Sequence, residues 1–194
     1  MNPCDSTVVS TKVFDTYVDS KDFERFVGSQ IPDGYIVVVA CKDECTTALS
    51  NTGKGWFASL GSKEIWKVGY REGFSFIGIQ GKKTEVYEKR AMQKRDKVSV
   101  TQVFEQLNDG EDNMPVCKPP LGDTNLKLML VQVYSAGYNA GNFAEIHIDG
   151  EQVLVANNEH NHQRGIHIVV INPHDGKIHS VNVFDTYRRS DKFD

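Results

Sequence analysis

The side chains in this sequence that are best suited to chemistry such as metal binding are its histidines. All six fall between His147 and His179, and "NNEHNHQRG" places His160 and His162 one residue apart. A His-x-His pair suits a metal site, because two imidazoles at that spacing can face one ion. The same stretch is also typical of a polar turn between antiparallel strands. We favour the turn, so the sequence predicts no metal site.

The four cysteines are the next candidates for chemistry: Cys4, Cys41, Cys45 and Cys117. The "CKDEC" spacing differs from the two-residue spacing of zinc knuckles and redox pairs. An even number permits disulfides, and four cysteines allow three pairings. Because Cys41 and Cys45 are close in sequence and the other two lie in loop-like regions, we expect Cys41–Cys45 and Cys4–Cys117.

The sequence shows little that would support catalysis. Asp43 and Glu44 are adjacent, so in an extended strand their side chains point apart and form a poor acid–base pair. No serine or cysteine has a local histidine-and-acid pattern beside it. The glycine-rich "SAGYNAGN" lacks the spacing of a phosphate loop. We therefore expect a protein without enzymatic activity and without a cofactor.

Composition excludes several classes of partner. The chain has 194 residues, of which 39% are hydrophobic, which is enough for one sizeable core. Its net charge of −4 gives no basic field for nucleic acid or acidic membranes. The basic cluster at 89–95, "KRAMQKR", lacks interleaved aromatics and indicates a solvated helix or loop face. No apolar run suits a membrane span, and the first residues show no signal peptide.

Hydrophobic patterning predicts helices in the first half of the chain and strands throughout. Phe23, Phe26 and Val27 are spaced for one face of a helix that ends near Gly28. The β-branched run 35–41 predicts a strand buried on both faces. We expect a second helix over 43–62 with five inward residues, a short turn or helix over 63–70, and a strand over 74–81; the inward residues are Ala48, Leu49, Trp56, Phe57 and Leu60.

The segment 109–123, rich in Gly, Pro and acidic residues, predicts a linker. Beyond it the pattern is that of strands alone, with turns at 137–141, 149–150 and 175–176. The expected strands cover 126–137, 143–150, 151–158, 165–173 and 177–187.

The pentapeptide "VFDTY" occurs at 13–17 and again at 183–187. The flanking sequences do not repeat, so a tandem repeat is excluded. If the second half of the chain is placed first, the halves join through a single copy. In that order "RGI", "VVINP", "FDTY", "PDG", "KDE", "LGS" and "GYR" resemble the interleukin-like EMT inducer domain, also called the GG domain. The chain is then a circular permutant, and one copy must pair beside the other, hang free or bind a second chain.

The resemblance implies an α+β, mainly β fold: two antiparallel sheets packed on each other with flanking helices. It covers most of the chain and implies one domain over 1–194. That domain is built from 12–108 and 124–188, with 109–123 as the linker. Permutation is tolerated when the original termini lie close together at the surface.

The resemblance also implies a carbohydrate site, because one family member, the stem domain of the protein O-mannose N-acetylglucosaminyltransferase, binds sugar. The matching positions are Arg164 of "RGI", Asp43 of "KDE" and Arg71 of "GYR". A carboxylate accepts from sugar hydroxyls, and a guanidinium donates to two of them. Candidates to border the site are Tyr70, Trp66, Tyr138, His162 and the loop asparagines Asn157, Asn158 and Asn161.

The implied function is that of a secreted lectin, with GlcNAc- or galactose-containing glycans among its partners and a homodimer as one assembly. The alternative is a cytokine-like or structural protein-binding domain. In that case Asp43 and the two arginines form a structural ion-pair network. Both interpretations predict that the cluster needs both halves of the chain, since Arg164 comes from one half and Asp43 and Arg71 from the other.

Overall fold

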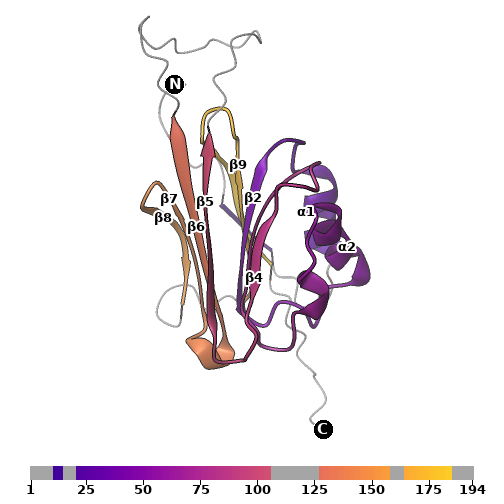
Figure 1. Cartoon of the computed structure of the whole chain (residues 1–194). Coiled ribbons are helices and arrows are strands. Elements are labelled where there is room, and N and C mark those ends of the chain that lie inside the picture. The colour runs from indigo at the N-terminus through magenta and orange to yellow at the C-terminus, as the bar shows by residue number, and fades with distance from the viewer. Residues whose placement is uncertain (1–10, 15–20, 106–126, 158–163, 185–194) are drawn as a thin grey trace, which may run out of the picture.

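The alternating and continuous hydrophobic runs form ten strands arranged in two layers, with helices as a third layer (Figure 1). The structure is a computed structural model that describes residues 11–14, 21–105, 127–157 and 164–184. This architecture confirms the expected mainly β, α+β fold of packed sheets with flanking helices. The strand pairing is mixed rather than antiparallel throughout, since two of the pairings are parallel. The proposed linker 109–123 lies outside the described residues, and the division into permuted halves stays a prediction.

The first sheet has the strand order β1-β10-β9-β2-β3-β4 and the second β5-β6-β7-β8. They are joined at one point, where Lys42 and Asp43 of β2 pair with Ala136 and Gly137 of β6. The first sheet contains β1 (Thr11–Phe14), β10 (Ile178–Phe184), β9 (Gly165–Ile171), β2 (Ile36–Asp43), β3 (Phe74–Ile79) and β4 (Tyr87–Arg90). The second contains β5 (Lys97–Glu105), β6 (Leu128–Gly137), β7 (Phe143–Ile148) and β8 (Glu151–Ala156).

Strand β2 is buried along its whole length because both of its faces are covered. Val37 and Val39 face the helices, and Val38 belongs to the core between the two sheets. This confirms the prediction made from its β-branched run. A strand in a sheet that is covered on both faces needs a continuous run of apolar residues, since neither face contacts water.

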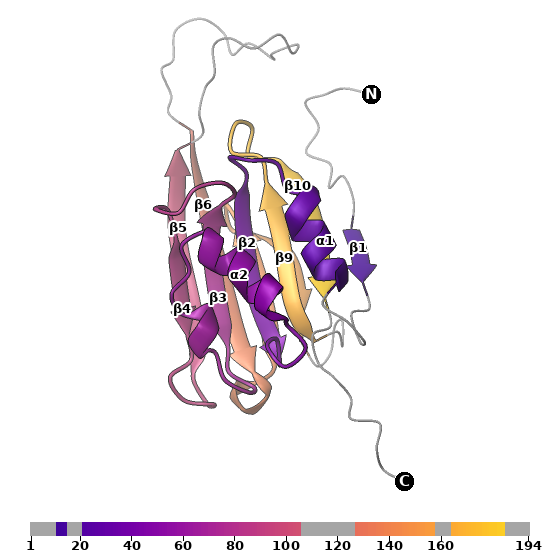
Figure 2. The ribbon, with the colours of Figure 1, turned by 90° about the vertical axis from the view of Figure 1, so that its right-hand side faces the viewer.

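Helices α1 (Lys21–Ser29) and α2 (Asn51–Ser59) cover the outer face of the first sheet (Figure 2). As predicted, α1 buries Phe23, Phe26 and Val27. The ring of Phe23 lies 5.9 Å from that of Phe57 on α2 and 5.2 Å from that of Phe184 on β10. Each buried aromatic of this kind contributes about 1.5–3 kcal/mol of hydrophobic stabilisation, so this cluster fixes both helices on the sheet.

The predicted start of the second helix, at residue 43, was wrong. It begins at Asn51, and Ser50 caps it by accepting a hydrogen bond from the Gly53 amide at 3.1 Å. Residues 44–50 are irregular, and the Glu44 carboxylate accepts the Thr46 and Thr47 amides within this segment. Gly53 does not break the helix. A Cβ there would lie 2.4 Å from Leu49 Cδ1, so glycine permits the close packing.

Strands β4 and β5 are features that the sequence prediction missed. Of the two predictions for segment 89–95, the solvated loop is confirmed for residues 92–95, which are exposed and lie in a turn, whereas Lys89 and Arg90 belong to β4. In β5 exposed residues alternate with more buried ones, among them Val98 and Phe104. The short helical turn predicted over 63–70 is confirmed as a 3-10 helix at Ile65–Lys67. A second 3-10 helix, Tyr138–Ala140, occupies the predicted turn after β6.

The Cys41–Cys45 disulfide is confirmed, with its Cα atoms 5.7 Å apart. It links the end of β2 to the irregular segment that follows. Cys4 and Cys117 lie outside the described residues. Within the described ranges no helix is long and apolar enough to cross a membrane.

The two "VFDTY" copies lie side by side at the edge of the first sheet (Figure 2). Strand β1 runs parallel to β10, with Val13 opposite Val183 and Phe14 opposite Phe184. Of the three outcomes expected for a duplicated strand, the structure shows one copy paired beside the other. Residues 15–17 and 185–187 of the two copies lie outside the described part.

The second copy holds the inner position, next to β9, and the residues preceding the repeat explain why. Val181 and Asn182 are 5% and 2% exposed, and the Asn182 amide donates to Ser180 Oγ at 3.2 Å. The corresponding residues of β1 are Thr11 and Lys12. A lysine in the place of Asn182 would bury a charge without a partner, which is costly. The strand position next to β9 therefore favours the second copy, which is preceded by Val181 and Asn182.

Replacing Asn182 by the residue of the other copy tests this selection. We expect Asn182→Lys to lower the free energy of unfolding by about 2–4 kcal/mol, because the ammonium is forced into a buried position. Thermal or urea unfolding measures the change. Ser99→Lys, on an exposed strand position, is the matched control and should change stability by less than about 0.5 kcal/mol. Equal stability of both variants would contradict the explanation.

Candidate functional site

Asp43, Arg71 and Arg164 meet where β2 ends. Asp43 is the last residue of β2, and Arg164 precedes β9, whose first residue pairs with Lys42. Arg71 lies in the turn that leads into β3, the other neighbour of β2. Because β9 and β3 both run antiparallel to β2, their starts meet its end. The topology thus brings the three predicted residues together from distant parts of the chain.

The arginines approach the Asp43 carboxylate without closing on it. Arg71 Nε lies 3.6 Å from Asp43 Oδ1, and Arg164 Nη1 lies 3.9 Å from Oδ2. Asp43 Oδ1 and Arg71 Nε are both buried, and neither has a hydrogen-bond partner within the described residues. Both arginine side chains stay partly exposed, at 28% and 29%, while Asp43 is 8% exposed. The cluster therefore presents donors to solvent above a buried acceptor.

Burial raises the pKa of Asp43 above the ordinary 3.8. The positive charges of Arg71 and Arg164 act against it, but burial together with the negative charge of Glu44 leaves the pKa raised. Desolvation disfavours the charged form, and well-formed ion pairs normally reverse that effect. Here the two arginines do not reverse it, so the ionised form of the Asp43 carboxylate lowers the stability of the folded chain.

The backbone at the site is also strained. Asp43 has φ 60° and Arg71 has φ 61°, in the left-handed region that non-glycine residues rarely occupy. Such a conformation costs on the order of 1 kcal/mol or more per residue. Two of the three cluster residues thus sit in disfavoured conformations, a pattern found where function rather than stability sets the geometry.

Two tyrosines frame the cluster. The Arg71 guanidinium carbon lies 4.2 Å from the centre of the Tyr138 ring and 5.0 Å from that of Tyr70. Lys94 Nζ lies 5.7 Å from the Tyr70 ring. Both tyrosines are about half exposed. Trp66 is equally exposed, yet within the described residues it makes no ion pair, hydrogen bond or ring contact with the cluster.

Glu44 is a positioning residue that the sequence prediction missed. Its buried carboxylate accepts the Arg71 amide at 2.6 Å, the Thr46 amide at 2.7 Å and the Thr47 amide at 2.9 Å. These bonds tie the turn carrying Arg71 to the end of β2. Glu44 was considered only as a catalytic partner of Asp43, and a carboxylate that binds distant amides leaves no periodic signal in a sequence.

Ser135 and Gly137, near the end of β6, support the site from the second sheet. Ser135 Oγ donates to the Cys41 carbonyl and accepts from the Phe74 amide, so it links β6 to both β2 and β3. Gly137 packs against Arg71. A Cβ at this position would lie 1.9 Å from the Arg71 carbonyl oxygen. The glycine at the start of the predicted turn 137–141 therefore also leaves room for the Arg71 backbone.

Lys42, the neighbour of Asp43 in β2, contacts Asn157, which follows β8. Lys42 is buried, and its Nζ donates to the Asn157 carbonyl at 3.1 Å. Burial lowers the pKa of Lys42, against the opposing effect of Asp43. The remaining predicted neighbours, His162, Asn158 and Asn161, lie outside the described residues.

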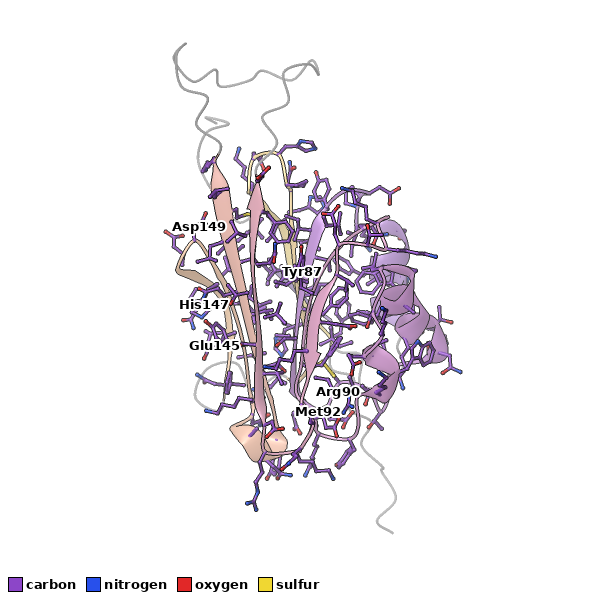
Figure 3. All side chains as sticks on the ribbon, in the orientation of Figure 1. Tyr87, Arg90, Met92, Glu145, His147 and Asp149 are labelled. Atoms are coloured by element: carbon purple, nitrogen blue, oxygen red, sulfur yellow. A yellow bond between two sulfur atoms is a disulfide. The ribbon has the colours of Figure 1, made fainter. Side chains whose placement is uncertain are left out.

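The described histidines are dispersed. Figure 3 shows Glu145 and His147 on the outer face of the second sheet, away from the helices; His147 Nε2 lies 3.5 Å from Glu145 Oε2. His167 is buried in β9, and His179 packs on Tyr35. Among the described residues no group of three metal-binding side chains comes together. His160 and His162 lie outside them.

The model of the family described as "Interleukin-like EMT inducer" matches residues 1–82 and 164–194, which together exceed half of the chain. The chain belongs to the interleukin-like EMT inducer family. The matched segments include all three cluster residues. The permuted order of the family's halves stays a hypothesis.

The chain is also similar to two kinds of curated protein. The "Cell migration-inducing and hyaluronan-binding protein" of Mus musculus is 40% identical over 77 residues, which cover 39% of this chain and 6% of that protein. "Protein FAM3C" of Rattus norvegicus is 35% identical over 79 residues, covering 40% of this chain and 34% of that protein. The chain thus spans a small part of the first relative and about a third of the second.

The pH dependence of stability distinguishes a stabilising ion pair from a buried charge held at a cost. Because the folded pKa of Asp43 is raised, the folded chain binds its proton more tightly than the unfolded chain, and stability falls as pH rises from about 3.8 through the folded value. Asp43→Asn removes this loss. We expect the variant to gain stability relative to wild type between acid and neutral pH, as measured by urea unfolding across that range. A variant that instead loses relative stability toward neutral pH would show that the ion pairs support the fold.

Gly137→Ala tests the support from β6. We expect it to cost about 2–3 kcal/mol of stability, because the new methyl group displaces the Arg71 backbone. Gly28→Ala on α1 is the matched control: its Cβ meets nothing within 4 Å, and the change should stabilise the helix slightly. Thermal unfolding of the two variants measures both effects. A Gly137→Ala variant as stable as wild type would contradict the close packing.

Proposed function

We propose that the protein is a non-catalytic glycan-binding protein whose site is formed by Asp43, Arg71 and Arg164. The observation that carries the proposal is the incomplete pairing within this cluster. Asp43 Oδ1 and Arg71 Nε have no hydrogen bond among the described residues, although they lie only 3.6 Å apart. A buried polar atom without a partner is costly, so the cluster is not optimised for stability. The partly exposed guanidinium groups of Arg71 and Arg164 are the parts of it that a ligand can reach.

The chemistry of the cluster suits vicinal sugar hydroxyls. A hydroxyl can donate to the Asp43 carboxylate while accepting from one of the guanidinium groups. Tyr70 and Tyr138 both contact the Arg71 guanidinium and are about half exposed, so their exposed ring surfaces can pack on the apolar face of a pyranose ring. The exposure of the two arginines leaves the site open to a ligand from solvent.

Three features support a binding role over a purely structural one. The pKa of Asp43 is raised despite two arginines, the backbones of Asp43 and Arg71 are strained, and the guanidinium groups do not close on the carboxylate. A network that served only stability would be expected to form short, bidentate pairs. Each feature lowers stability, and together they favour a site shaped for a ligand.

The charge of the site favours a glycan that carries an acidic group. The two arginines balance the carboxylates of Asp43 and Glu44, and Lys94 adds a further positive charge beside Tyr70. The similarity to a protein named as hyaluronan-binding supports a carbohydrate ligand in general. GlcNAc- and galactose-containing glycans are included as neutral candidates for the same site.

The alternative function is cytokine-like recognition of a protein partner, with the cluster as a structural network. The family description, "Interleukin-like EMT inducer", favours it. For either function we propose an extracellular location. The Cys41–Cys45 disulfide supports it, because disulfides persist in oxidising compartments.

A glycan array with neutral and acidic sugars, followed by titration of the strongest ligand, tests the proposal. We expect Arg71→Ala to weaken binding at least about tenfold, since a charged hydrogen bond contributes about 1.5–3 kcal/mol. The melting temperature should change little. Arg25→Ala, an exposed arginine on α1, is the matched control and should bind normally. Absence of glycan binding by the wild type, or an Arg71→Ala variant that loses stability but keeps its affinity, would contradict the proposal.

A further inference from the structure

The Cys41–Cys45 disulfide closes a small loop around three polar residues at the site. These residues are Lys42, Asp43 and Glu44, and all three are buried, as are both cysteines. Asp43 belongs to the proposed glycan site, and Glu44 holds the turn that carries Arg71. The disulfide is therefore part of the packed structure around the site rather than a link between two surface segments.

The sheet fixes one end of this loop. Cys41 is a residue of β2 that pairs with Ile166 of β9, and its carbonyl accepts a hydrogen bond from Ser135 Oγ. Among the described residues the strand pairings of β2 end at Asp43, so Cys45 lies beyond the last of them. The disulfide therefore attaches the irregular segment after β2 to a point that the neighbouring strands hold.

The disulfide also requires the chain to turn back at the end of β2. In an extended strand the Cα atoms of residues four apart are separated by about 13 Å, because each residue adds about 3.3 Å. The Cα atoms of Cys41 and Cys45 are only 5.7 Å apart. The left-handed conformation of Asp43, with φ 60°, lies within this reversal. A closed disulfide thus favours the folded-back loop, in which Asp43 lies beside Arg71 and Arg164.

Glu44 connects the loop to the turn of Arg71. Its Oε1 accepts the Thr46 amide, the Thr46 hydroxyl and the Thr47 amide, and its Oε2 accepts the Arg71 amide at 2.6 Å. Because Glu44 lies inside the closed loop, the disulfide restricts where this carboxylate can lie. Opening the loop gives Glu44 other positions, in which the Arg71 amide loses its partner.

We propose that the Cys41–Cys45 disulfide is a positioning element of the site, which keeps Glu44 on the Arg71 amide and Asp43 in its left-handed conformation. Opening the disulfide releases the turn of Arg71 but leaves the sheets packed, because β2 pairs with β3 and β9 through residues 36–42. The weaker glycan binding that we expect on opening rests on the proposed function, whereas the release of Arg71 does not.

Amide hydrogen exchange of the full chain, measured by NMR before and after reduction, tests the release of Arg71. A dithiol supplies two electrons and two protons to the disulfide, which gives two thiols and leaves the dithiol as a cyclic disulfide. We expect the Arg71 amide to exchange at least about tenfold faster after reduction, because it loses a hydrogen bond to a charged group. The Val38 amide, between β3 and β9, should exchange as before, and reoxidation should restore slow exchange of Arg71.

Two variants serve as matched controls. Cys41→Ala/Cys45→Ala gives the opened loop without a reductant, so its Arg71 amide should exchange fast with and without dithiol. Cys4→Ala/Cys117→Ala removes the other two cysteines and should respond to the dithiol as the wild type does. A dithiol effect that disappears in this second variant would come from Cys4 or Cys117 and would contradict the proposal. Reduction of the wild type guards against a variant that fails to fold.

Applying the same samples to an array of neutral and acidic glycans separates this inference from the proposed function. If the oxidised wild type binds a glycan, reduction should weaken that binding at least about tenfold, since Arg71 is released from its position. If it binds none, the proposed function fails and the exchange of the Arg71 amide still decides the inference. Unchanged exchange of Arg71 in the opened chain, equally faster exchange of Val38, or a reduced chain that keeps its affinity would overturn it.

Discussion

The architecture depends on how β2 ends. The strand runs through the centre of the fold, buried on both faces, and at Lys42 and Asp43 its backbone pairs with the second sheet, the one such pairing among the described residues. Three chain segments converge there: the start of β9, the turn before β3 and the end of β6. A strand that stops inside such a junction must place its last polar side chain among other buried groups. Asp43 is that side chain, and its surroundings decide what the junction can do.

The surroundings hold Asp43 in its charged form without fully compensating it. Glu44 fixes the Arg71 amide, Gly137 admits the Arg71 backbone, and Ser135 joins β6 to the carbonyl of Cys41. These supports are well satisfied by hydrogen bonds. The strain and the missing bonds are concentrated on Asp43 and Arg71 themselves. A rigid frame around an under-satisfied centre is the arrangement expected of a preorganised binding site.

Much of this could be predicted from the sequence where one physical signal dominated. The burial of β2 followed from its β-branched run, the inward face of α1 from the spacing of three apolar residues, and the turns from glycine with aspartate. The start of α2 was mispredicted because the Glu44 carboxylate and the Cys41–Cys45 disulfide constrain the irregular segment 44–50. Neither interaction leaves a periodic pattern in the sequence. Strand β4 was missed because it is short and polar at its end.

The site, too, could be predicted only in part. The meeting of Asp43, Arg71 and Arg164 was expected from the family resemblance, whereas spacing alone could not have joined residues so far apart. Glu44, Ser135 and Gly137 could not be predicted, because their roles are contacts between strands that become neighbours only after folding. Arg164 and Tyr138 come from one part of the chain and Asp43 and Arg71 from another, so the site exists only when both parts are assembled.

The affinity of the wild-type chain for its strongest glycan ligand, measured by calorimetry from acid to neutral pH, tests the central claim most directly. If the ionised Asp43 carboxylate accepts sugar hydroxyls, the ligand prefers the charged form. The affinity should then rise as pH increases through the raised pKa of Asp43 and level off above it. An affinity independent of pH across this range would contradict the account, because it would mean that the ligand does not use the carboxylate.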